Sequence, residues 1–86
     1  MTIETREQAT NVMRQCEELE TYLEHIDEFD SMREAEYNDL MNALDAYFLS
    51  DDQRKALDSF DGNGVETYNE ALRLGVDPEF ARWLYL

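Results

Sequence analysis

Hydrophobic residues recur at helical spacing along the first third of the chain. Between about Glu4 and Asp27 the intervals between apolar positions alternate between three and four residues, as on one face of an α-helix. The positions are Ala9, Val12, Cys16, Leu19, Leu23 and Ile26, and Met13, Tyr22 and Phe29 widen the stripe. The pattern predicts one long helix, with Thr2 or Thr5 available as its N-cap.

A second amphipathic segment begins after the polar break "DEFDS". Either Asp30 or Ser31 can cap it, and Glu34 stands where a capping box places its acid. Its apolar face reaches about Leu49 and predicts a second long helix. That face consists of Tyr37, Leu40, Met41, Leu44, Tyr47 and Phe48.

Shorter helices are predicted in the remainder of the chain. Ser50 can cap a third helix that stops at the turn sequence "DGNG", and a fourth ends at Gly75. Asp77 can cap a last short helix, because Pro78 suits its first position. The apolar positions on these three segments are Ala56, Leu57 and Phe60, then Val65, Tyr68, Ala71 and Leu72, and finally Phe80, Trp83 and Leu84.

No segment alternates between apolar and polar residues over the length of a strand. The amphipathic faces therefore predict an all-α fold, a compact helical bundle of two long helices followed by two or three short ones. A chain of 86 residues is expected to form a single domain, residues 1–86, with a thin core.

Cysteine usage and hydropathy bear on the compartment. The single cysteine, Cys16, has no internal disulfide partner, which favours a reducing compartment. No stretch approaches the roughly 18 consecutive apolar residues of a membrane span, and the N-terminal "MTIETREQ" lacks the pattern of a secretion signal. We therefore expect a cytoplasmic protein that does not bind a membrane.

Negative charge changes this picture more than any other feature. The chain has 21 Asp and Glu residues against 7 Lys and Arg, a formal net charge of −14. Thirteen of the carboxylates lie between Gln15 and Gln53, where Arg33 is the one cation. Direct binding to nucleic acid or to an anionic membrane is disfavoured, because both carry negative charge themselves. The expected partner is a basic surface or a cation.

The carboxylates of the first helix follow its apolar stripe. Glu17, Glu20, Glu24 and Asp27 each come one residue after an apolar position, so we expect them to form a continuous acidic ridge. Like charges at this spacing cost about 0.2–0.5 kcal/mol per pair, and a small domain needs a net charge of only about 2 to 8 for solubility. The surplus charge therefore favours a role in binding. The predicted partner-binding residues are Glu17, Glu20, Glu24, Asp27, Glu28, Asp30, Glu34 and Glu36.

In size, charge and helical character the whole chain resembles the small acidic inhibitors that phages and mobile elements direct against restriction or CRISPR enzymes, some of which mimic DNA. No family motif carries this resemblance. It implies an inhibitor that occupies the basic nucleic-acid-binding surface of a host defence protein, a nuclease or a CRISPR-type complex, by DNA mimicry through an acidic helical face. Such a protein acts in the host-cell cytoplasm and binds a basic nucleic-acid-binding protein rather than nucleic acid.

The segment "SFDGNGVETYNE" resembles the calcium loop of the EF-hand family. The residues that match the third, fifth, sixth and twelfth positions of that loop are Asp61, Asn63, Gly64 and Glu70. Ser59 at the first position and Glu66 at the eighth depart from the family pattern. The resemblance implies calcium binding, and a plain connection between two helices is the alternative.

The tripeptide "DSM", residues 30–32, is similar to the Asp-Ser-Leu site of acyl carrier proteins, which are also small, acidic and helical. The similarity implies a phosphopantetheine group on Ser31, with Glu36 where that family often has an acid. Phe29 and Glu28 stand where a nearby glycine is expected, and the apolar register of the following helix is displaced. Ser31 as a helix cap is the alternative. A small acidic interaction module, EF-hand-like or carrier-like, is thus the second function class.

Enzymatic chemistry is not expected from this sequence. His25 is the only histidine, and Cys16 lies on the apolar stripe as a predicted core residue. No second Cys or His is present to complete a zinc site, and the chain lacks a convincing nucleophile–base pair. We therefore predict no catalytic residue, no metal and no cofactor.

Aromatic residues leave two alternatives open. Tyr22, Tyr37 and Tyr47 lie among the acids and are expected to be core residues with hydroxyls at the rim, interface anchors being the alternative. The apolar C-terminal "FARWLYL" is expected to close the core and to leave Tyr85 and Leu86 partly exposed. Self-association of this end into a homodimer is the alternative.

Overall fold

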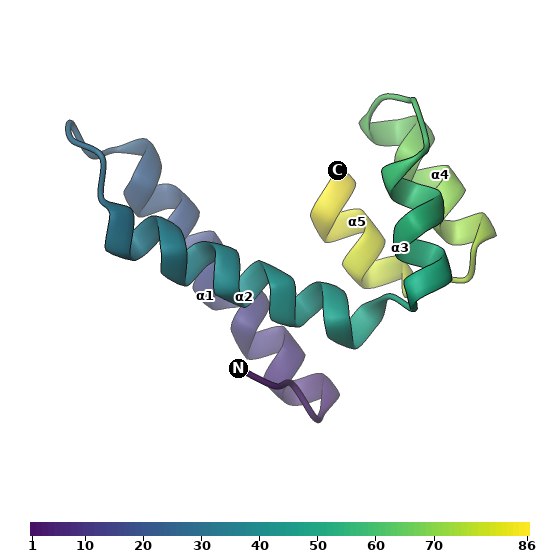
Figure 1. Cartoon of the computed structure of the whole chain (residues 1–86), viewed down its shortest axis with the longest axis horizontal. Helices are drawn as coiled ribbons and strands as arrows, with labels where there is room; N and C mark the ends of the chain where they lie inside the picture. Colours follow the sequence, from purple (N-terminus) through teal and green to yellow (C-terminus); the bar gives the residue numbers. More distant parts are fainter. The chain divides into compact units, whose positions relative to one another are not determined.

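The structure is a computed structural model that describes residues 1–86. It contains five α-helices and no strand, so the predicted all-α fold of two long helices followed by short ones is confirmed (Figure 1). The helices are α1 (Arg6–Glu24), α2 (Ser31–Phe48), α3 (Asp51–Asp58), α4 (Gly64–Arg73) and α5 (Pro78–Tyr85). None of them combines the length and the apolar character that crossing a membrane requires.

The chain divides into two compact units, Met1–Tyr47 and Phe48–Leu86. The first unit contains α1 and almost all of α2, which follow one another as a helical hairpin with a short connecting turn. The second unit contains α3, α4 and α5.

Helix α1 begins at a complete capping box. The Thr5 hydroxyl accepts a hydrogen bond from the backbone N–H of Gln8 at 3.1 Å, and the Gln8 side-chain oxygen accepts from the backbone N–H of Thr5 at 3.3 Å. These bonds satisfy donors that the first turn of a helix leaves without an intrahelical partner. Thr5 is therefore the cap, and the helix starts two residues later than the sequence pattern suggests.

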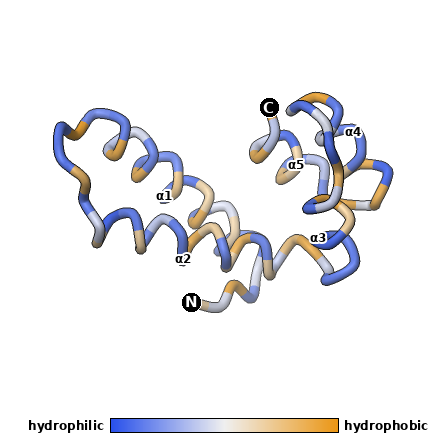
Figure 2. Tube along the Cα trace, turned by 45° about the horizontal axis from the view of Figure 1, so that its top comes forward, coloured by the Kyte–Doolittle hydropathy of each residue, from blue (hydrophilic) through white to orange (hydrophobic).

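The core of the hairpin lies at the end away from its turn. The buried residues are Ala9, Val12, Met13 and Cys16 of α1, and Leu40, Ala43 and Leu44 of α2. Further along the predicted apolar stripe, Leu19, Leu23 and Ile26 are only partly buried. Figure 2 shows hydrophobic positions recurring along both helices between hydrophilic ones. The hairpin is thus well packed at one end and thinly packed near the turn.

Asp30, rather than Ser31, caps α2. Its Oδ1 atom accepts a hydrogen bond from the backbone N–H of Arg33 at 3.1 Å, and Ser31 is already the first helical residue. Arg33 therefore occupies the third helical position, so the predicted capping-box role of Glu34 is wrong. The Tyr22 hydroxyl also donates to Asp30 Oδ2 at 3.1 Å, which links the last part of α1 to the start of α2.

The second unit buries Leu57, Ala71, Val76, Phe80 and Ala81, and one glutamine and one aromatic stack add specific contacts. Gln53 completes a capping box with Ser50 at the start of α3, and its Nε2 atom donates to the carbonyl of Leu74 at 3.0 Å. The Phe48 and Phe80 rings stack with their centroids 4.3 Å apart, and the Trp83 ring lies 6.1 Å from Phe80.

Local signals in this unit act largely as the sequence predicts. Asp77 Oδ1 caps α5 by accepting the Phe80 backbone N–H at 3.0 Å, and Pro78 opens that helix. Gly75 has a φ of 87° just after α4, a conformation that favours glycine. Phe60 is the exception, because α3 ends at Asp58 and leaves Phe60 in the following loop.

Gly64 is required where α4 approaches the end of α5. A Cβ atom at this position would lie 2.7 Å from the backbone carbonyl oxygen of Tyr85. We expect Gly64→Ala to lower the free energy of unfolding by about 1–3 kcal/mol through this overlap, although alanine normally stabilises a helix. Urea denaturation monitored by circular dichroism measures the effect. Asn69→Ala, at an exposed position of the same helix, is the control and should be neutral or slightly stabilising.

Candidate functional site

Three predicted binding residues share one edge of α1. Glu17, Glu20 and Glu24 are all exposed and fall within about 60° of one another around the helix axis. The predicted ridge stops there, because α1 ends at Glu24 and Asp27 lies in the turn. The helical part of the row therefore consists of three carboxylates rather than four.

Glu34 of α2 extends this row across the hairpin. Burial raises the pKa of the Tyr37 hydroxyl, and the charges of Glu20, Cys16 and Glu34 raise it further. Tyr37 therefore lies within electrostatic reach of a carboxylate from each helix. We call Glu17, Glu20, Glu24 and Glu34 the acidic edge.

Cys16 lies directly beneath the acidic edge. Burial raises the pKa of its thiol from 9.0 to about 11, and the neighbouring charges of Glu20 and Glu17 contribute to the rise. The side chain has no exposed surface, which confirms its predicted place in the core. A neutral, covered thiol is a poor nucleophile, so Cys16 is a structural residue.

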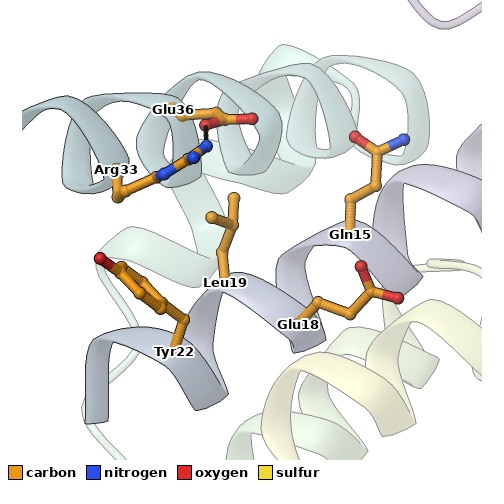
Figure 3. Close-up of a pocket in the computed structure, with 6 residues that line it drawn as sticks. All are labelled: Gln15, Glu18, Leu19, Tyr22, Arg33 and Glu36. Atoms are coloured by element: carbon orange, nitrogen blue, oxygen red, sulfur yellow. Dashed lines mark hydrogen bonds and ion pairs between the residues drawn. The ribbon is translucent and has the colours of Figure 1, made fainter. Parts of the chain in front are cut away.

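Glu18 and Glu36 belong to a different side of the hairpin. They line a hollow of about 300 Å³ between α1 and α2, together with Gln15, Leu19, Tyr22 and Arg33. Figure 3 shows Leu19 pointing from α1 toward α2 across this hollow. Arg33 Nη1 donates to Glu36 Oε2 at 2.9 Å, so the one cation of this region pairs with a predicted binding residue. Glu36 is thus separated from the acidic edge and partly neutralised.

The turn between the helices carries the other predicted carboxylates. Asp27 and Glu28 are exposed there, whereas Asp30 is engaged by Tyr22 and by the backbone of Arg33. The eight predicted residues therefore do not form one row. The structure brings four together as the acidic edge, leaves two exposed in the turn, and employs Asp30 and Glu36 in internal bonds.

Two exposed apolar side chains lie at the connection between the helices, Phe29 in the turn and Met32 in the first turn of α2, and the sequence pattern predicted neither as a surface feature. Phe29, assigned to the apolar stripe, is 80% exposed, and Met32 is 82% exposed. Tyr22 and Tyr47 are also exposed, which corrects their predicted place in the core, while Tyr37 is partly buried. One sequence signal was available for Phe29. The residue before a helix cap packs best on an apolar fourth helical residue, and here that position is Glu34.

Two of the matched residues of the EF-hand-like segment, Asn63 and Glu70, use their side-chain oxygens in other bonds. Asn63 Oδ1 caps α4 by accepting the Glu66 backbone N–H at 2.9 Å, and Glu70 forms an ion pair with Arg73. Arg73 also donates a hydrogen bond to Glu70 Oε1, and this bond lowers the pKa of the Glu70 carboxyl. No group of three or more His, Cys, Asp or Glu side chains in the structure is arranged to hold a metal ion.

The remaining candidate residues lie at helix ends. Ser31 is exposed at the first position of α2. His25 is exposed after the last residue of α1, and its Nδ1 atom lies 2.7 Å from the carbonyl oxygen of Thr21, to which it donates in the tautomer protonated there. Both residues line the open hollow beside the connection between α1 and α2.

Comparison with known proteins identifies no relative of this chain. No protein-family model matches the chain, and no curated protein or solved structure matches it either. A functional conclusion therefore depends on the residues described above.

Titration of the groups beneath the acidic edge should make the fold sensitive to alkali. Because the folded pKa of Cys16 lies above its unfolded value of 9.0, its contribution is complete below pH 9 and is lost as the pH rises through about 11. Tyr37 acts with the same sign from about pH 10 upward. We expect the free energy of unfolding to fall by about 2–3 kcal/mol between pH 9 and pH 11, measured by urea denaturation.

Cys16→Ala provides the control for this pH dependence. The variant should be less stable at pH 7 because it leaves a small cavity, but its stability should fall less steeply above pH 9. A pH profile identical to that of the parent chain would contradict the assignment of the alkaline transition to Cys16.

Proposed function

We propose that the protein is an inhibitor that occupies the basic nucleic-acid-binding surface of a host defence protein, such as a nuclease or a CRISPR-type complex. The observation that supports this proposal is the acidic edge, which combines three exposed carboxylates of α1 with the partly buried Glu34 of α2. The surrounding segment reinforces it, because residues 17–36 contain nine carboxylates and one cation, Arg33. Any cationic groove that accepts this hairpin is thereby closed to nucleic acid.

The charge spacing fits occupation of a groove better than a close copy of DNA. Along α1 the acidic edge places one carboxylate every three or four residues, or about 4.5–6 Å of helix axis. One DNA strand places a phosphate every ~3.4 Å. Glu34 and the turn residues add charge beside this row. The hairpin therefore has charge of the same sign as DNA at a lower density along its axis. This is compatible with steric blocking strengthened by electrostatic attraction.

Electrostatic attraction also gives such an inhibitor a kinetic advantage. Complementary fields raise association rates from about 10⁵–10⁶ M⁻¹s⁻¹ toward 10⁸–10⁹ M⁻¹s⁻¹ at low salt. Because the formal net charge is −14, the field around this small chain has one sign over most directions of approach. Binding should therefore be fast and strongly weakened by salt.

A carrier-like function is the second candidate, and one observation favours it. Ser31 is exposed at the first position of α2, directly after Asp30, as a serine that carries phosphopantetheine has to be. If this function holds, intact mass spectrometry of protein from its native cell will show a phosphopantetheine adduct that Ser31→Ala removes.

Competition with DNA tests the inhibitor proposal directly. Immobilised protein is incubated at low salt with extract from the cell in which it acts, and bound proteins are identified after elution by salt or by duplex DNA. We expect nucleic-acid-binding proteins that either eluent releases. Release by salt with retention in excess DNA would contradict mimicry.

Charge reversal locates the binding surface. The triple variant Glu17→Lys, Glu20→Lys and Glu24→Lys should lose capture of these proteins by at least about tenfold, because each reversal replaces an attraction by a repulsion. The matched control reverses Asp58, Asp61 and Glu66, three exposed acids of the second unit, and changes the net charge equally. Equal losses in both variants would indicate a non-specific effect of net charge and would contradict the assignment to the acidic edge.

A further inference from the structure

The turn between α1 and α2 exposes apolar side chains that the fold leaves uncovered. Phe29 and Met32 stand three residues apart with about four-fifths of their surface exposed, and Tyr22 nearby is 45% exposed. In Figure 2 this turn carries hydrophobic positions between hydrophilic ones. Monomeric domains scatter single apolar residues over their surface, but a cluster at one end of a hairpin is typical of a contact site.

The same end of the hairpin is concave and thinly packed. An open hollow of about 710 Å³ is lined by Tyr22 of α1, by the turn, and by Ser31 and Met32 of α2. Leu19, Leu23 and Ile26, which continue the apolar stripe toward it, are only partly buried. Apolar surface thus extends from the partly buried stripe out to the turn.

Hydrogen bonds give the turn a defined conformation before any partner arrives. The backbone N–H of His25 donates to the carbonyl of Tyr22 at 3.1 Å and ends α1. Asp30 begins α2 and also accepts the hydroxyl of Tyr22. A site that is already ordered loses less conformational entropy on binding.

Charge identifies the kind of partner that fits. Asp27 and Glu28 are exposed on the turn itself, and Glu24 lies one helical turn before them. A second copy of this chain is repelled by such a rim, and so is an anionic membrane. The complementary surface has apolar side chains at its centre and cations around them, as on a basic amphipathic helix.

We propose that the α1–α2 turn is a docking surface for a basic amphipathic helix of the partner protein, with Phe29 and Met32 as its apolar anchors. This inference rests on the proposed function and deepens it. The acidic edge attracts the cationic partner, and the turn adds contacts that salt does not screen. Aromatic residues and methionine are enriched at such contacts, where flexible Met side chains adapt to different apolar neighbours.

Two synthetic peptides separate the apolar contribution from the electrostatic one. The first peptide carries leucines on one helical face and lysines on the other, and the second has every leucine replaced by glutamine. Isothermal titration calorimetry with the full chain should show the Leu/Lys peptide binding at least about tenfold more tightly than the Gln/Lys peptide. Two-dimensional NMR should place the largest amide shifts caused by the Leu/Lys peptide in residues 22–33.

Matched variants assign this difference to the turn. The Phe29→Ser/Met32→Ser variant should bind the Leu/Lys peptide only as tightly as it binds the Gln/Lys peptide. Val65→Ser/Leu86→Ser removes two exposed apolar side chains of the second unit, 58% and 64% exposed, and should retain the difference. Circular dichroism checks that both variants stay folded, as expected for changes at exposed positions.

The remaining outcomes separate the two proposals. Equal affinity of both peptides, weakened by Glu17→Lys/Glu20→Lys/Glu24→Lys, would overturn the docking surface and leave the electrostatic proposal standing. Binding of neither peptide at low salt would overturn both. Sedimentation equilibrium showing a dimer that Phe29→Ser/Met32→Ser dissociates would overturn the docking proposal, because the occupant of the turn would then be a second copy.

Discussion

The stability of the hairpin depends on the balance between two effects. Packing of a small apolar core stabilises it, and repulsion among its many carboxylates destabilises it. Ala9, Val12 and Cys16 of α1 and Leu40 and Leu44 of α2 are buried at the end away from the turn. The acidic edge follows the exposed side of α1 next to this core, so the same helix that supplies apolar contacts also carries unfavourable charge. Because the core ends before the turn, a cationic partner of the proposed kind would relieve this repulsion where the hairpin's own packing is weakest.

Helix starts were partly predictable where the signal is local, although the pattern allowed either Thr2 or Thr5 and no cap was predicted for α4, which Asn63 caps. Thr5, Ser50 and Asp77 cap their helices through bonds to residues three positions ahead, and such bonds depend on residue type and spacing alone. The choice between Asp30 and Ser31 was not predictable in this way. Asp30 is also bound by the Tyr22 hydroxyl, a contact between two helices that a reading along the chain does not contain.

The candidate site was predictable in composition and only partly in geometry. Spacing placed Glu17, Glu20 and Glu24 on one face correctly, because the helix is regular there. The prediction failed beyond the end of α1. Asp27 lies in the turn rather than in the acidic row, and Phe29 is exposed to solvent rather than part of the apolar stripe. When the helical repeat of apolar positions is continued beyond the true end of a helix, an exposed side chain is wrongly predicted to lie in the core.

Cys16, beneath the acidic edge, and Met32, beside the α1–α2 turn, lie in opposite chemical environments. Cys16 is covered and its thiol stays protonated, so oxidants reach it slowly. Met32 is open to solvent at the turn, and its conversion to the sulfoxide makes an apolar side chain polar. Oxidative ageing of a purified sample would therefore alter the exposed Met32 and Met1 before the buried Cys16.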